Sequence, residues 1–307
     1  MRVLITGVAG FIGSNLAMSH LKDGDRVIGV DNFSTGTTRN LEALDKIDFI
    51  DSDLLESRKL LPKSVDVIYH FASPASPEKY MAQAINTMDV NTVGTRLLLE
   101  YTLEIGARLI FASTSEIYGD PLENPQREEY WGNVNPIGPR SVYDEAKRFG
   151  ETFVAHFQRE YAVNAGIIRI FNTYGPNMDP YDGRVVSNFI RQALLGEPLT
   201  IYGSGNQTRS FCYIDDLVAG IRKMGESDIK RPINLGNPQE RTLLDLANIV
   251  LEVTNGKSTL EFMELPEDDP QQRRPDISKA KNLLGWEPKV DIQTGIERTA
   301  AWISKVL

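Results

Sequence analysis

Thr6-Gly7-Val8-Ala9-Gly10-Phe11-Ile12-Gly13 is the stretch that decides the fold. It follows an apolar run at residues 3–6 that is typical of a buried strand, and it leads into a helical pattern at residues 11–21. Glycines at such a turn let backbone N–H groups approach a pyrophosphate, and the helix N-terminus adds about half a positive charge. The stretch therefore predicts a dinucleotide-binding turn, whereas a chance glycine-rich turn is the alternative.

Strand and helix patterns alternate through the first half of the chain. Short apolar runs predict strands at residues 3–6, 26–30, 49–51, 65–71, 108–113 and 165–171. Helical patterns occupy residues 11–21, 80–84, 91–105 and 141–161. This β-α-β-α order predicts an α/β fold with a doubly wound, parallel (Rossmann) sheet that helices cover on both faces.

The pattern changes after Phe171, where Gly, Pro, Asn and Asp cluster over residues 172–183. Later elements are shorter: a helix at 186–195, strands near Thr200 and Phe211, a helix from Asp215, a strand at 232–236 and a helix at 243–253. We expect a smaller, discontinuous α/β lobe that binds the substrate. The predicted division is 1–173 with 211–240 for the dinucleotide-binding domain, and 174–210 with 241–307 for the second lobe.

Composition excludes several classes of function. The formal net charge of −9 argues against nucleic acid and against anionic membrane surfaces, both of which need a basic face. No apolar stretch suggests a membrane span, and the opening Met-Arg-Val-Leu-Ile predicts a strand instead of a signal peptide. The single cysteine, Cys212, predicts a reducing, cytoplasmic setting and a buried thiol, and with only three histidines no metal site is expected.

Asp31 ends the second predicted strand, where a carboxylate can accept hydrogen bonds from both ribose hydroxyls of a dinucleotide. It would repel a 2′-phosphate, which favours NAD over NADP, and Arg39 is the nearby cation that could weaken this preference. Other candidate contacts follow the strand ends, although Asp53 alone could equally be a turn residue. The candidate cofactor-binding residues are Gly7, Gly10, Phe11, Ile12, Gly13, Asp31, Asn32, Asp53, Leu54, Phe71, Ala72, Ser73, Tyr143 and Lys147.

Tyr143 and Lys147 are four positions apart on a predicted helix, so they share one face. A lysine ammonium beside a phenol stabilises the phenolate and is expected to lower the tyrosine pKa. Such a tyrosine can take the proton of a sugar hydroxyl while hydride leaves the same carbon for NAD. The spacing alone fits an ordinary surface pair, but the dinucleotide-binding turn favours the catalytic interpretation.

Thr114, Ser115 and Glu116 follow the strand predicted at 108–113, at the edge where parallel sheets bind ligands. Thr114 can donate a hydrogen bond to the sugar oxygen that becomes a carbonyl. Glu116 brings a carboxylate to the same place, where it can act as a general base or organise a water. A solvated loop glutamate is the alternative.

At these residues the sequence resembles the extended short-chain dehydrogenase/reductase family over nearly its whole length. Beyond the turn, Thr114 and the Tyr143–Lys147 pair, the shared features are Asn172, Pro198-Leu199-Thr200-Ile201-Tyr202-Gly203, Gln207-Thr208-Arg209, Arg273-Arg274-Pro275-Asp276 and Leu284-Gly285-Trp286-Glu287-Pro288. Within the family it is most similar to the UDP-glucuronate decarboxylases. That likeness rests on Ala72-Ser73-Pro74-Ala75-Ser76-Pro77, on residues 112–121 and 130–140, and on Asp182-Gly183-Arg184-Val185-Val186-Ser187-Asn188-Phe189.

The resemblance implies oxidation of the sugar at C4 by NAD, loss of CO2 from the resulting β-keto acid, and return of the hydride. Ser115 precedes Glu116, where 4,6-dehydratases of the family use Asp-Glu; serine is a poor acid for expelling a hydroxyl at neutral pH. A 4-epimerase, a dehydratase and an inactive NAD-binding relative remain the alternatives. Intact Thr114, Glu116, Tyr143 and Lys147 favour an enzyme.

The resemblance also implies the residues that hold a UDP-sugar. The diphosphate needs arginines, for which Arg209 and either Arg273 or Arg274 are candidates, whereas Arg184 and Arg191 are weaker ones. Arg273 could instead face the sugar carboxylate. The candidate substrate-binding residues are Ser115, Asn172, Thr200, Tyr202, Arg209 and Arg273, with Thr200 and Tyr202 expected near uracil. Helices at 91–105 and 141–161 predict a homodimer by analogy.

Overall fold

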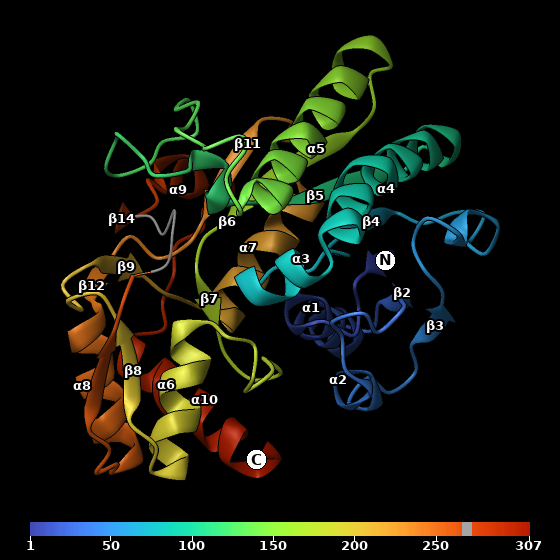
Figure 1. Cartoon of the computed structure of the whole chain (residues 1–307). Coiled ribbons are helices and arrows are strands. Elements are labelled where there is room, and N and C mark those ends of the chain that lie inside the picture. The colour runs from blue at the N-terminus through green and yellow to red at the C-terminus, as the bar shows by residue number, and fades with distance from the viewer. Residues whose placement is uncertain (266–271) are drawn as a thin grey trace.

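The computed structural model describes residues 1–265 and 272–307, and a seven-stranded, wholly parallel sheet lies at its centre. The strand order is β11-β6-β5-β4-β1-β2-β3 (Figure 1). The strands are Arg2–Thr6 (β1), Arg26–Asp31 (β2), Asp48–Asp51 (β3), Val67–His70 (β4), Arg108–Thr114 (β5), Ala165–Ile170 (β6) and Pro232–Leu235 (β11). The predicted α/β fold with a doubly wound parallel sheet is confirmed.

Helices cover both faces of this sheet. Strand residues alternate between faces, so Val3 and Ile5 of β1 pack in one apolar cluster, whereas Leu4 between them packs in the other. The first cluster includes Leu16 of α1 (Phe11–Lys22) and residues of α7 (Ile214–Glu226). The second includes residues of α4 (Ala84–Ile105) and α5 (Ser141–Glu160), which pack against each other (Figure 1).

The strand register sets the position of the candidate site. Thr6 at the end of β1 is paired with Val30 of β2 on one side and with His70 of β4 on the other. The glycine turn after Thr6 therefore lies between the segments that follow β2 and β4. In the same way Thr114 of β5 is paired with Ile170 of β6, so the carboxyl ends of these strands form one continuous edge.

Apart from α7 and β11, most elements after β6 form a second group, seen at the lower left of Figure 1. Its helices are α6 (Val185–Leu195), α8 (Leu243–Thr254) and α10 (Ile292–Val306), which pack on one another. Its small sheets comprise β7 (Thr173–Tyr174) with β10 (Cys212–Tyr213), β8 (Leu199–Tyr202) with β13 (Leu260–Met263), and β9 (Thr208–Ser210) with β12 (Glu240–Thr242) and β14 (Gln272–Arg273). The side chains of Thr242 and Asp245 form a capping box at the start of α8.

Several elements differ from the prediction. The helix expected at 91–105 begins earlier, at Ala84. Its first turns contain polar residues, so the sequence shows no apolar periodicity there. Two of these polar residues, Thr87 and Asn91, are buried and hydrogen-bonded. By contrast, β9 and β10 directly flank Phe211, which agrees with the strand predicted near it. The short helices α2 (Thr38–Glu42), α3 (Pro77–Ala82) and α9 (Ser278–Leu284) complete the helices of the described residues. Part of the predicted second lobe, residues 266–271, lies outside the described residues.

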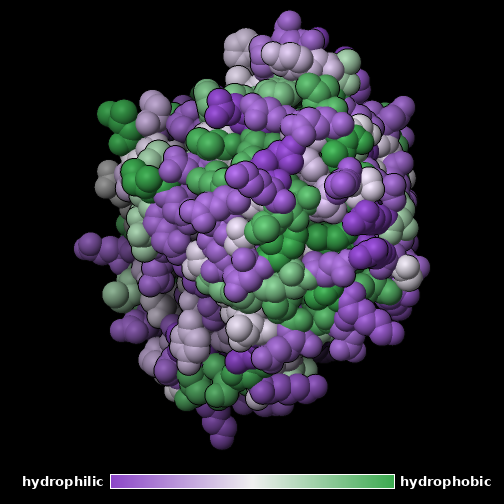
Figure 2. Space-filling model, turned by 90° about the vertical axis from the view of Figure 1, so that its right-hand side faces the viewer, coloured by the Kyte–Doolittle hydropathy of each residue, from purple (hydrophilic) through white to green (hydrophobic). Residues whose placement is uncertain are grey.

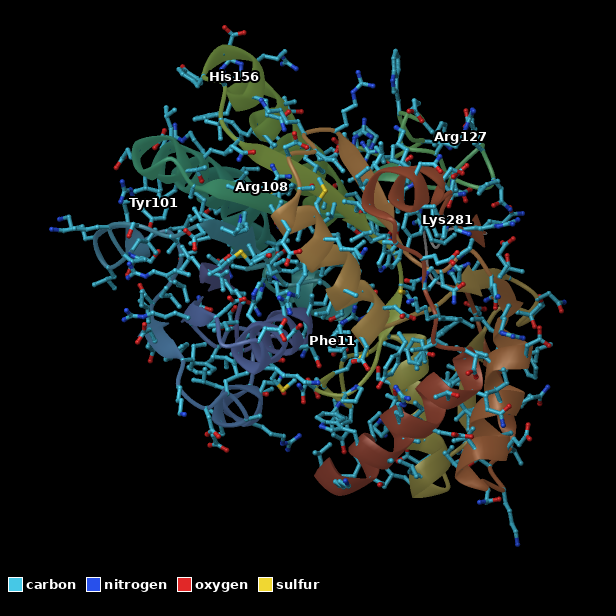
Figure 3. The ribbon with its side chains drawn as sticks, turned by 180° about the vertical axis from the view of Figure 1, so that it is seen from behind. Phe11, Tyr101, Arg108, Arg127, His156 and Lys281 are labelled. Carbon is cyan, nitrogen blue, oxygen red and sulfur yellow. The ribbon has the colours of Figure 1, made fainter. Side chains whose placement is uncertain are left out.

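Arg108 anchors the start of β5 beside one end of α7, as Figure 3 shows from behind. Its guanidinium donates to the carbonyl of Met224 at 3.2 Å and to that of Ile229 at 2.8 Å. It thus supplies hydrogen bonds to carbonyl groups at the end of α7 and just beyond it, where the helix itself offers no N–H partner. Burial lowers its pKa to about 10. Cys212 is buried, as predicted. Outside residues 266–271, no helix has the length and apolar character needed to cross a membrane.

Candidate active site

A cavity of about 460 Å³ lies at the carboxyl ends of β5 and β6. Helices α3, α5 and α6 and the strands β8 and β9 contribute to its walls. Every residue predicted to be catalytic or substrate-binding lines it: Thr114, Ser115, Glu116, Tyr143, Lys147, Asn172, Thr200, Tyr202, Arg209 and Arg273. The structure thus brings together residues that are scattered over most of the chain.

Tyr143 lies in the first turn of α5 and is buried. Burial raises its pKa, although a hydrogen bond with Thr114 opposes the rise. The predicted lowering of the pKa is therefore wrong for this structure. The main physical reason is the burial of the Tyr143 phenol itself. Burial also lowers the pKa of the Lys147 ammonium to about 7, so Lys147 carries only part of a positive charge near neutral pH. Its Nζ donates to the Ala112 carbonyl at 2.7 Å and lies 5.7 Å from the centre of the Tyr143 ring.

Glu116 is paired with two arginines. Its Oε2 accepts from Nη2 of Arg140 at 2.6 Å and from Nη2 of Arg273 at 3.1 Å. Burial alone would raise the pKa of Glu116, but Arg273 and Arg140 outweigh it and hold the value at about 2. A carboxylate held this acidic by two arginines is a poor proton acceptor. The role of Glu116, as a general base or as the residue that organises a water, stays a prediction. Glu116 holds two guanidinium groups at the cavity wall.

The structure decides between Arg273 and Arg274. Arg273 is 1% exposed, and its Nη1 donates to the carbonyls of Ser115 and Gly119. Because β14 pairs with β9, Arg273 lies opposite Arg209, and both line the cavity. The side chain of Arg274 instead points towards Glu240, with Nη1 3.5 Å from its carboxylate, and is 41% exposed.

Two smaller cavities flank the glycine turn, with volumes of about 60 and 110 Å³. They share Gly7, Gly10, Thr35, Phe71 and Ser73. Of the residues predicted to bind the cofactor, Tyr143 and Lys147 line the large cavity. The others line the two small ones: Gly7, Gly10, Phe11, Ile12, Gly13, Asp31, Asn32, Asp53, Leu54, Phe71, Ala72 and Ser73. Phe71 and Ser73 also line the large cavity, so the three cavities are adjacent to one another.

The glycine turn fits a pyrophosphate. A Cβ on Gly13 would lie 2.1 Å from the carbonyl oxygen of Gly7, so the helix packs against the turn only because no side chain is present. Gly7 adopts a φ of +74°, and a Cβ there would meet the backbone of Phe71 and Ala72 at 2.8 Å. At Gly10 the backbone faces the two small cavities, where a phosphate can approach the start of α1.

Asp31 lies where the ribose of a dinucleotide is expected. Its Oδ2 accepts from the backbone N–H of Ala9 at 2.9 Å, and its Oδ1 accepts from that of Phe33 at 2.8 Å. These bonds fix both carboxylate oxygens at the end of β2. Arg39 is exposed and lines neither small cavity, so the structure does not bring it to the ribose position.

The segment 176–179 is tied across the glycine turn. Asn15 of α1 donates to the carbonyl of Pro176 at 3.0 Å, and Asn40 of α2 donates to that of Asn177 at 3.0 Å. Lys79 of α3 forms an ion pair with Asp179 at 2.8 Å. Three helices therefore hold this connection over the smaller cavities.

Several cavity residues were missed by the sequence analysis. Arg140 had a usable signal, because it lies one turn before Tyr143 on the same helical face. Arg184, a weaker candidate, lines both the large cavity and one small one. Arg191 lines none of the three cavities described above and pairs with Glu197. The other missed residues with polar groups include Ser34, Thr35, Glu78, Tyr80, Asn86, Asp182, Asn188 and Gln207.

Comparisons with known proteins agree with this geometry. The sequence model of the NAD dependent epimerase/dehydratase family matches residues 3–236. UDP-glucuronic acid decarboxylase 1 from Danio rerio is 50% identical over 100% of this chain and 73% of the relative. The solved UDP-glucose 4-epimerase from Thermotoga maritima, with UDP-glucose, is 29% identical with a TM-score of 0.92, covering 100% and 99% of the two chains. UDP-glucuronic acid 4-epimerase from Bacillus cereus, in complex with UDP-glucuronic acid and NAD, is 31% identical with a TM-score of 0.89 and full coverage of both chains.

Proposed function

The chain belongs to the NAD dependent epimerase/dehydratase family, and from that premise we propose that it is an NAD-dependent UDP-glucuronate decarboxylase that forms UDP-xylose and CO2. The observation that carries the proposal is Ser115-Glu116 at the wall of the cavity, in a chain half identical to a decarboxylase of this substrate. A dehydratase must expel the C6 hydroxyl and needs an acid at the position of Ser115. UDP-glucuronate instead carries a carboxylate at C6.

NAD supplies a hydride acceptor at C4 of the sugar and later returns that hydride. Tyr143 takes the proton of the C4 hydroxyl, because its phenol is the titratable group beside Thr114 in the cavity wall. Lys147 lies beside the ring, and its ammonium favours the phenolate when it is charged. Thr114 donates a hydrogen bond that fixes the C4 oxygen.

Decarboxylation follows from the oxidation. The 4-keto sugar is a β-keto acid, so the bond from C5 to the carboxylate breaks, CO2 leaves, and the electron pair enters the C4 carbonyl as an enolate. Thr114 and Tyr143 stabilise this oxyanion by hydrogen bonds. A proton then adds to C5, and Tyr143 gives its proton back to the C4 oxygen as the ketone is reduced to the alcohol, so no net oxidation occurs.

The arginines of the cavity match the charges of the substrate. Arg209 and Asn172 line the cavity and suit the diphosphate. Arg273 and Arg140 both line the cavity beside Glu116, and two guanidinium groups at this wall suit an anionic substrate. We assign Thr200 and Tyr202 to the uracil end; the Thr200 hydroxyl already accepts a hydrogen bond from Gln192 at 2.9 Å.

A 4-epimerase is the second candidate, because the solved structures most like this chain include 4-epimerases at about 30% identity. Incubation of the purified protein with UDP-glucuronate and NAD separates the two. Mass spectrometry is expected to show loss of CO2 from the sugar nucleotide. An unchanged mass with an altered sugar configuration would identify an epimerase, and no turnover would identify an NAD-binding protein.

The proposal also covers the division of the chain into two lobes, its oligomeric state and its location. We assign 1–173 with 211–240 to NAD binding and 174–210 with 241–307 to the sugar nucleotide. Exposed apolar side chains on α4 and α5, among them Ile85, Val93, Leu103 and Phe149, support a homodimer through these helices. Figure 2 shows hydrophobic residues grouped among hydrophilic ones on the side of the molecule where α4 lies. The single cysteine supports a cytoplasmic location.

A further inference from the structure

A second tyrosine stacks on Tyr143. Tyr80 of α3 lies with its ring centre 4.9 Å from that of Tyr143, and the two ring planes are inclined by only 4°. Tyr80 is 1% exposed and lines the same cavity. Parallel rings at this separation form an offset stack, a favoured geometry of aromatic pairs.

Tyr143 needs support from outside its own helix. It lies in the first turn of α5, and the N-cap residue is Arg140, whose side chain makes no capping hydrogen bond. Backbone bonds hold this turn, such as the one from the Tyr143 N–H to the Arg140 carbonyl at 3.0 Å. The first turn of an uncapped helix is the part most prone to fraying. The position of the Tyr143 phenol therefore depends on the side chains that pack against it.

Tyr80 is itself firmly placed. The N–H of Tyr80 donates to the carbonyl of Ser76 at 2.9 Å, and its carbonyl accepts from the hydroxyl of Thr87 on α4 at 3.3 Å. Lys79 of the same short helix forms an ion pair with Asp179, and both residues line the small cavity of about 110 Å³. The stack thus connects Tyr143 to the segment that follows β4 and lines the cofactor cavities.

The Tyr80 hydroxyl is buried and has no hydrogen-bond partner among the residues that the structure describes. The ring, and not a hydrogen bond, is therefore what α3 contributes to Tyr143. A phenylalanine would keep the ring and leave no new group unpaired.

We propose that Tyr80 is a positioning residue that holds the phenol of Tyr143 in line with the sugar hydroxyl through ring stacking. The inference rests on the proposed function. A displacement of a reacting group by about 1 Å can cost on the order of 10²-fold in rate. Loss of the Tyr80 ring should therefore lower kcat and leave substrate binding largely intact.

The test compares Tyr80→Phe and Tyr80→Leu with the wild-type holoenzyme. Tyr80→Phe should keep kcat within about threefold, whereas Tyr80→Leu should lower kcat by roughly 10- to 100-fold with KM for UDP-glucuronate changed less than about threefold. NAD affinity, measured by calorimetry, should stay the same in both. Tyr101→Leu is the matched control: Tyr101 is a buried tyrosine of α4 (Figure 3) whose hydroxyl contacts the Pro62 carbonyl, so its loss should lower Tm and leave kcat unchanged.

Equal loss of activity in Tyr80→Phe and Tyr80→Leu would overturn the inference, because the hydroxyl would then be the acting group. An unchanged kcat in Tyr80→Leu would also overturn it, as would a loss confined to KM. The rate that is measured is that of sugar oxidation, a step that decarboxylases, epimerases and dehydratases share. If the proposed function is wrong, the wild-type protein forms a different product. If the inference about Tyr80 is wrong, the wild-type product is as proposed but the Tyr80 variants do not show the expected change in kcat.

Discussion

Glu116 accepts a hydrogen bond from Nη2 of Arg273 at 3.1 Å, although the two residues are 157 positions apart in the chain. The hydrogen bond joins the segment that follows β5 to strand β14, and both residues line the cavity. Arg273 is almost fully buried, and Glu116 supplies a counter-charge to its guanidinium.

Glu116→Gln should destabilise the protein by about 3 kcal/mol at neutral pH, because the buried guanidinium loses its counter-charge. The folded pKa of Glu116 is about 2, below the usual 4.5, so its contribution is complete above pH 4.5 and disappears as pH falls towards 2. Urea unfolding at several pH values measures it. Glu197→Gln, which breaks the more exposed pair with Arg191, should cost no more than about 0.5 kcal/mol. Equal losses in the two variants would contradict the prediction.

Lys147→Met should stabilise the protein while it abolishes turnover. Burial lowers the folded pKa of Lys147 from 10.5 to about 7, so below pH 7 the folded protein carries the full cost of a buried ammonium. The gain in the free energy of unfolding should reach roughly 4 kcal/mol at pH 6 and shrink as pH rises towards 10. The same change at exposed Lys305 gives a control. A gain that does not vary with pH would refute the explanation.

Tyr143→Phe should lower turnover by a factor on the order of 10² to 10⁴, since the phenol oxygen that takes the proton is removed. NAD binding should remain, because the glycine turn and Asp31 lie outside the change. Product formation and calorimetric titration with NAD report the two effects separately. Full activity in this variant would rule out the mechanism.

Gly13→Ala should abolish NAD binding or folding, because the new Cβ would lie 2.1 Å from the Gly7 carbonyl oxygen. Gly24→Ala is the matched control. Its φ is +80°, but no atom lies within 4 Å of the added Cβ, so only the backbone strain of about 1–2 kcal/mol remains. Thermal unfolding and NAD titration of both variants test the difference. Similar behaviour would show that close packing at the turn is unimportant.

Asp31→Ala should weaken NAD binding about tenfold and reduce the preference for NAD over NADP, because the carboxylate no longer repels a 2′-phosphate. Affinities of both dinucleotides for the wild-type protein and the variant measure this. A wild-type protein that binds NADP as tightly as NAD would contradict the assignment of Asp31.

The sequence predicted the parallel sheet well, because buried strands such as β1 and β5 leave uninterrupted apolar runs between helical patterns. It also predicted the members of the site, since residues such as Thr114 and Tyr143 belong to spaced motifs. The start of α4 was placed too late because its first turns are polar, although Thr87 is buried there by tertiary packing.

The protonation properties could not be read from the sequence. The spacing of Tyr143 and Lys147 places them on one face, but it does not say that burial would weaken the lysine charge. Likewise the motif around Glu116 does not reveal that Arg140 and Arg273 converge on it from two distant segments. Such effects depend on the depth of each group and on contacts across the fold.

The strand β11 joins the edge of the central sheet only after the chain has left β6 and built the elements from β7 to α7. A ribosome must therefore release the chain as far as Leu235 before the sheet can be completed. Until then β6 is an uncovered edge that can pair with a neighbouring nascent chain. Synthesis halted between these two strands should leave a product that aggregates instead of a smaller folded dinucleotide-binding protein.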